Sequence, residues 1–85
     1  MLIKCKLLLN GPGPSEAIVS IVTIQGRQEE VVVDTTLVRD GHLEVGPLVA
    51  LQDDRALVEL PREAASGSLR VWIPTSDIVG ERQAA

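Results

Sequence analysis

The sequence contains almost no aromatic residues: Trp72 is its one tryptophan, and phenylalanine and tyrosine are absent. Proteins that bind single-stranded nucleic acid stack the bases on aromatic side chains. The formal net charge of −4 would also repel a phosphate backbone at long range. We therefore expect that nucleic acid is not the ligand.

Cysteine and histidine are equally scarce, because Cys5 and His42 are the single examples of each. One cysteine cannot form an intramolecular disulfide, which suits a reducing compartment, and we expect a cytoplasmic protein. A zinc site needs several such ligands converging. No nucleophile motif links His42 to Ser66, Ser68 or Ser76. We therefore expect no metal, no cofactor and no enzymatic activity.

No long apolar segment is present. The mostly apolar residues 1–9 are interrupted by Lys4 and Lys6, and residues 10–14 end the run with two glycines and two prolines. This pattern lacks the continuous apolar region of a signal peptide and the roughly 18 apolar residues of a membrane span. We expect a soluble protein that does not associate with membranes.

The composition that remains favours β-structure, since 45% of the residues are hydrophobic and Val and Ile are abundant. Apolar and polar residues alternate over 2–9, which predicts a strand with Ile3, Cys5, Leu7 and Leu9 on its buried face. Six further strands are predicted at 17–25, 30–38, 48–52, 55–60, 69–73 and 78–79. The strands at 17–25 and 30–38 should pair as a hairpin.

Glycine, proline and aspartate mark the turns, at 11–15, 26–27, 40–41 and 53–54, and residues 61–68 form a loop. Residues 74–77 suit one helical turn. Six or seven short strands at this spacing predict a small barrel or sandwich. We expect a single all-β domain over 1–79 and a flexible tail over 80–85.

Two segments resemble SH3-like barrels. Leu43-Glu44-Val45-Gly46-Pro47-Leu48-Val49-Ala50-Leu51 is similar to the stretch where a glycine at a diverging turn leads into the second barrel strand. Trp72-Ile73-Pro74-Thr75-Ser76-Asp77-Ile78-Val79 is similar to the closing pattern, in which one helical turn precedes the last strand.

The resemblance implies a small SH3-like β-barrel of about five strands over residues 30–79, with residues 1–25 as an additional N-terminal β-hairpin. The groove tyrosine and asparagine of that family are replaced by Asp77 and Ser76. Proline-rich peptides dock between aromatic rings, and a single tryptophan cannot form such a groove. We therefore do not expect polyproline recognition.

Trp72 is the strongest candidate for a contact residue. A lone tryptophan beside Arg70 and Pro74 has the composition of an interface hot spot, and Arg62 with Glu63 would supply its polar rim. The alternative is that Trp72 caps one end of the barrel.

The strands also carry more apolar surface than one core can bury, which favours contact with another protein. The segments that are apolar on both faces are Leu7-Leu8-Leu9, Val31-Val32-Val33 and the run from Ile18 to Ile24. Bare apolar edges aggregate, so we expect the N-terminal hairpin to be covered by another protein or by a second copy in a homodimer or larger homo-oligomer.

These features predict a non-enzymatic protein-binding or assembly module. One alternative is an accessory subunit or regulator of an enzyme complex. Another is a nucleic-acid-binding small barrel of the OB kind, which would display a basic groove formed by some of its arginines. The positions of five arginines on the surface would distinguish this alternative from the first: Arg27, Arg39, Arg55, Arg62 and Arg70.

Overall fold

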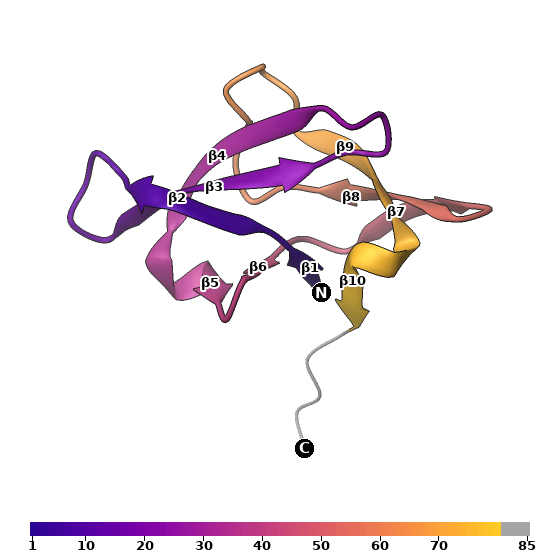
Figure 1. Cartoon of the computed structure of the whole chain (residues 1–85), viewed down its shortest axis with the longest axis horizontal. Helices are drawn as coiled ribbons and strands as arrows, with labels where there is room; N and C mark the ends of the chain where they lie inside the picture. The colour runs from indigo at the N-terminus through magenta and orange to yellow at the C-terminus, as the bar shows by residue number, and fades with distance from the viewer. Residues whose placement is uncertain (81–85) are drawn as a thin grey trace.

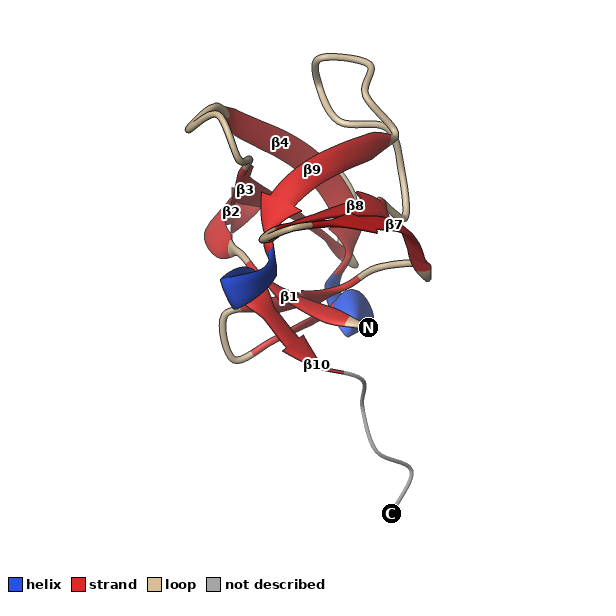
Figure 2. Ribbon diagram, turned by 90° about the vertical axis from the view of Figure 1, so that its right-hand side faces the viewer, coloured by secondary structure: helices blue, strands red, loops and turns tan. Residues whose placement is uncertain are grey.

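The computed structural model describes residues 1–80, which form ten short strands and two single turns of 3₁₀ helix. Residues 81–85, which make up most of the predicted flexible tail at 80–85, lie outside the described residues. The prediction of an all-β chain is confirmed. The strands form three small antiparallel sheets that pack around one core (Figures 1 and 2).

The first sheet has four strands in the order β10-β1-β6-β5, and the second and third have three each, in the orders β2-β3-β4 and β7-β8-β9. The strand bounds are β1 Leu2–Lys4, β2 Lys6–Asn10, β3 Glu16–Val22, β4 Gln28–Asp34, β5 Val38–Arg39, β6 His42–Glu44, β7 Leu48–Gln52, β8 Arg55–Glu59, β9 Arg70–Pro74 and β10 Ile78–Gly80. The two 3₁₀ turns are η1 Thr35–Leu37 and η2 Thr75–Asp77.

Most of the predicted turns are confirmed, and the turn residues have the backbone angles that a tight reversal requires. Asp40 and Gly41 both have positive φ, 53° and 80°, as the two central residues of a type I′ hairpin turn do. Asp53 has a φ of 55° in the two-residue turn between β7 and β8. The predicted pairing of the second and third runs is also confirmed, because β3 and β4 pair along their whole length.

The prediction of one continuous strand over 2–9 is wrong, because the strand is divided at Cys5 into β1 and β2. Ile3 is fully buried in β1, whereas Leu7 and Leu9 in β2 are 56% and 59% exposed. The prediction that both leucines face the core is wrong, because the chain leaves the first sheet at Cys5 and becomes an outer strand of the second. The amide of Cys5 donates to the carbonyl of Gly41 at this bend, over 3.0 Å.

The N-terminal region is part of the common fold. β2 and β3 do form a hairpin, but β1 lies between β10 and β6 in the four-stranded sheet. Residues 1–25 are therefore not an addition to a body made of 30–79.

The three sheets are not joined by continuous strand pairing into a closed barrel. Single backbone hydrogen bonds connect them instead. The amide of Ile24, just beyond β3, donates to the carbonyl of Trp72 in β9 over 2.8 Å, and the amide of Ala65 donates to Glu30 in β4 over 2.8 Å. These bonds tie the second sheet to the third and to the loop that follows β8.

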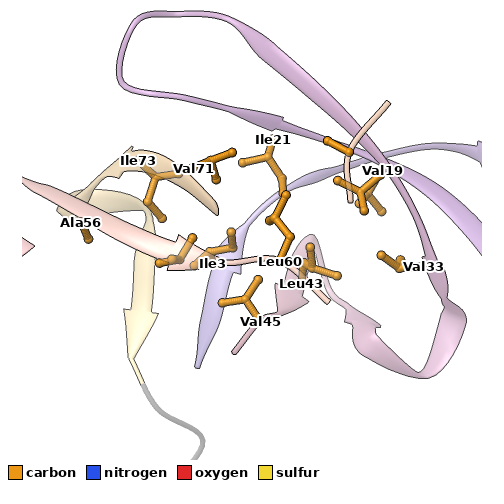
Figure 3. Packing of buried hydrophobic residues seen from close by; sticks show 13 residues of the cluster. Ile3, Val19, Ile21, Val33, Leu43, Val45, Ala56, Leu60, Val71 and Ile73 are labelled. Atoms are coloured by element: carbon orange, nitrogen blue, oxygen red, sulfur yellow. The ribbon is translucent and has the colours of Figure 1, made fainter. Parts of the chain in front are cut away.

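The core is built mainly from small and β-branched side chains, together with two leucines, contributed by all three sheets (Figure 3). Ile3, Leu43 and Ile73 are fully buried, one from each of β1, β6 and β9. Ala64 is also buried, although it lies in the loop after β8. The remaining members are Val19, Ile21, Val31, Val33, Val45, Ala56, Val58, Leu60 and Val71.

Candidate functional site

The outer face of the third sheet carries Trp72. Val71 and Ile73 point into the core, so the alternation of β9 places Arg70, Trp72 and Pro74 on the opposite face. Trp72 lies directly across from Leu57 of β8, and Leu57 lies across from Ala50 of β7. Residues opposite each other share a face, so these three form an apolar row across the sheet.

Charged residues flank this row on both sides. Arg70 lies opposite Glu59, with its Nε 3.1 Å from a carboxylate oxygen. At the other end of the sheet, Arg55 lies opposite Pro74. We call this surface, comprising Ala50, Arg55, Leu57, Glu59, Arg70, Trp72 and Pro74, the Trp72 face. It has an apolar centre and a polar border.

The backbone of Trp72 is held on both sides of its strand. Its neighbour on one side is Leu57 of β8, and on the other its carbonyl accepts the hydrogen bond from Ile24. The indole, which is half-buried, therefore projects from a strand that is anchored to two sheets. A strand fixed in this way loses little further backbone freedom on binding.

Arg62, the remaining predicted contact residue, belongs to a different surface. Its Nη1 lies 3.4 Å from a carboxylate oxygen of Glu16 in β3. Arg62 and Glu63 line a groove of about 260 Å³ on the outer face of β3 and β4, beside Ile18 and Val32. The structure thus brings Arg70, Trp72 and Pro74 together and places Arg62 apart from them.

A second cleft, of about 360 Å³, opens at the bend between β1 and β2. Cys5 lies in its wall, and burial raises the pKa of the thiol above its ordinary value. The thiol is therefore protonated at neutral pH and is a weak nucleophile. The other lining residues are Lys4, Lys6, Ser20, Val22, Gln28 and Asp77.

Exposed apolar side chains concentrate on two outer strands. Six of the nine large exposed hydrophobic residues described lie on β2 and β7, each of which ends a sheet. They are Leu7, Leu8 and Leu9 on β2, and Leu48, Val49 and Leu51 on β7. Surplus apolar surface was predicted at the β2 residues, although Leu7 and Leu9 were also assigned to the buried face of their strand. The β7 residues were missed, because their run is short and nothing in it shows that the strand lies at the end of a sheet.

The arginines are distributed over all parts of the described chain. Arg27 lies in the turn between β3 and β4, Arg39 in β5, and Arg55 and Arg70 at the starts of β8 and β9. Arg62 and Arg70 are each paired with a carboxylate. This distribution does not favour the basic groove that the nucleic-acid alternative requires.

Other chemistry-bearing residues lie apart. The hydroxyl of Ser66 donates to Glu29 over 2.7 Å, whereas His42 lies in β6 between Lys4 and Arg39. Within residues 1–80, no group of three or more His, Cys, Asp and Glu side chains gathers as metal ligands would. The part of the chain described by the structure also holds no helix with the length and apolarity of a membrane span.

Comparison with known proteins gives no relative for this arrangement: no family model, no curated protein and no solved structure matches the chain.

Proposed function

We propose that this chain is a non-enzymatic protein-binding or assembly module that contacts its partner through the Trp72 face. The observation that supports this is the apolar row of Ala50, Leu57 and Trp72 bordered by charged residues. Protein interfaces have an apolar centre and a polar rim, and tryptophan and arginine dominate their binding energy.

The charges of the Trp72 face favour a protein partner over a polyanion. Arg70 is paired with Glu59, so its charge is already compensated. Arg55 is the one remaining cation of this face. A phosphate backbone needs several uncompensated cations, whereas a protein surface can contact a mixed border of this kind.

We also propose that the fold is related to SH3-like barrels, with the three sheets as an open version of that arrangement. In support, the single turn η2 directly precedes the last strand β10, as in the closing pattern of that family. Gly46 lies between β6 and β7, and its amide donates to Glu59 over 2.9 Å, at the point where the resemblance places the diverging turn. Cross-strand distances measured by NMR would test whether the sheets close in solution.

A capture experiment from the native lysate tests the Trp72 face. The wild-type chain, Trp72→Ala and Val79→Ala serve as baits, because Val79 is an exposed apolar residue of another sheet. We expect a protein that is retained by wild type and by Val79→Ala and is lost with Trp72→Ala. Capture that is equal for all three baits would contradict the proposal.

The purified partner then gives a direct measurement. Because Trp72 is the single tryptophan of the chain, its fluorescence reports on this face alone. Titration with a partner that lacks tryptophan should shift or quench the emission and saturate. If the captured protein is an enzyme whose rate changes with wild type and not with Trp72→Ala, the module is a regulatory subunit of that enzyme.

A further inference from the structure

β2 and β7 are both unpaired along one edge. β2 pairs with β3 alone and β7 with β8 alone, so each has a row of backbone groups without a strand partner. In each strand the register shifts by one residue in the middle of the apolar run, beside Leu8 in β2 and beside Val49 in β7. An unpaired edge can act as a template for pairing with another chain. A bulge twists the edge away from continuous backbone pairing, so a contact between these two edges depends on their apolar side chains.

The two edges carry opposite charges at one end. β2 begins with Lys6, shortly after Lys4, and residues 1–15 contain no acidic residue. β7 ends at the turn formed by Asp53 and Asp54. If the two strands run antiparallel, the basic start of β2 lies next to this acidic turn.

We propose that the β2 edge of one copy packs antiparallel along the β7 edge of a second copy. In this contact Lys6 faces the turn at Asp53 and Asp54, and the leucines 7–9 cover Leu48, Val49 and Leu51. The inference rests on the proposed function and names the partner for the assembly role. The Trp72 face remains available for a different protein.

Charge favours this contact over the two symmetric ones. Antiparallel pairing of two β2 strands centred on Leu8 sets Lys6 against Asn10, and pairing of two β7 strands centred on Ala50 sets Asp53 against Pro47. Neither arrangement forms an ion pair. The contact between β2 and β7 covers both apolar edges and brings opposite charges together, which also determines its direction.

The position of the two edges determines the form of the assembly. Both views place β2 and the β7–β8 hairpin on opposite sides of the molecule (Figures 1 and 2). Each copy can therefore contact two neighbours, one through each edge. A contact between two different surfaces produces a ring or an open chain of molecules, not a closed dimer.

Sedimentation velocity of the whole chain, from low to high micromolar concentration, tests this contact. We expect species heavier than a dimer, whose proportion increases with protein concentration and decreases with added salt. A monodisperse monomer throughout, or a species that stops at the dimer, would overturn the proposal.

Exchanging the charges tests the pairing itself. One variant is Lys6→Glu, and the other combines Asp54→Lys with Asp53→Asn, which suits the positive φ of that position. Either variant alone should need at least about tenfold more protein to associate. An equimolar mixture should associate as wild type does, because the altered edge of one variant can then meet the altered edge of the other, and the two unaltered edges can meet each other. A mixture that stays dissociated would overturn the proposal.

Arg27→Glu is the matched control, because it makes the same charge change in an exposed turn of the second sheet, and it should associate like wild type. Trp72→Ala should also associate like wild type, whereas Lys6→Glu should still bind the partner of the Trp72 face. Loss of assembly and loss of partner binding are therefore separate results.

Discussion

At the scale of single residues, backbone angles decide where this chain turns. Asp40 and Gly41 are both left-handed, and they hold β5 against β6. Glycine adopts this conformation freely, whereas a side chain there crowds the following carbonyl.

Gly41→Ala is therefore expected to lower the free energy of unfolding by about 1 kcal/mol. The cause is the φ of 80° and not a lack of space, because an added Cβ would approach nothing closer than the Cys5 carbonyl oxygen at 4.0 Å. Urea denaturation measures the loss. Gly41→Asn should lose less, since asparagine tolerates positive φ; an equal loss in both variants would point to sterics.

Asp34 makes stability depend on pH. It caps η1, and its carboxylate accepts hydrogen bonds from the amide and the hydroxyl of Thr36, both over 2.9 Å. These bonds hold the pKa of Asp34 below its ordinary value of 3.8. A lowered pKa in the folded state means that the contribution is present above about pH 4 and is lost as the pH falls through the folded-state value.

The comparison with Asp34→Asn tests this sign. The amide keeps a hydrogen-bond acceptor at the cap but does not titrate. As the pH falls below about 4, we expect the free energy of unfolding of wild type to decrease relative to that of Asp34→Asn. Urea denaturation at several pH values measures this difference. A difference that stays constant over this range would contradict the role assigned to the cap.

At the scale of elements, the loop between β8 and β9 is held to the second sheet by a few bonds. The amide of Ala65 donates to Glu30, and the hydroxyl of Ser66 donates to the carboxylate of Glu29. Glu29 is one of two buried polar residues described, and its hydrogen bond with Ser66 is partly buried. Buried polar groups that lose a partner are destabilising.

Ser66→Ala should therefore lower the free energy of unfolding by about 1–3 kcal/mol. The control is Ser76→Ala, which removes an exposed hydroxyl from η2 and should change stability by less than about 0.5 kcal/mol. Both are measured by chemical denaturation. Equal stability of the two variants would show that the bond to Glu29 contributes nothing.

Local sequence patterns predict the individual strands well, but they predict poorly which strands lie next to each other in a sheet. The alternation around Val71 and Ile73, the turn at Asp40 and Gly41, and the single turn before β10 all follow from nearby residues. The exposure of Leu7 and Leu9 does not follow from nearby residues, because it depends on the chain leaving one sheet for another at Cys5. A local pattern contains no information on which strand lies alongside.

The same limit applies to the candidate surface. Arg70, Trp72 and Pro74 lie on one face of β9, as the sequence allows one to predict, because residues two apart in a strand share a face. The position of Arg62 could not be predicted in this way. It depends on the loop after β8, which is hydrogen-bonded to β4 and places Arg62 beside Glu16. The uncovered β7 edge is likewise a product of sheet order.

At the scale of the whole molecule, stability depends on a core shared among the sheets. Ile3 of β1 is fully buried in it, and β1 lies between β6 from the middle of the chain and β10 near the end of the described residues. Ile3→Ala should lower the free energy of unfolding by about 2–5 kcal/mol, measured by chemical denaturation.

Leu9→Ala provides the comparison, because Leu9 is more than half exposed on β2, the next strand along the chain. It should change the stability of the monomer by less than about 0.5 kcal/mol, measured at low protein concentration. A loss similar to that of Ile3→Ala would mean that the β2 edge is covered within the monomer.

The pairing of β1 with β10 also determines when the four-stranded sheet can be completed. Leu2 lies opposite Gly80 and Ile3 opposite Ile78, so one side of the first strand is completed by the last strand. During synthesis the ribosome adds residues in order, and the opening segment must wait with one edge vacant until residue 80 has emerged. A nascent chain that stalls before β10 would therefore expose this vacant edge to neighbouring chains and chaperones.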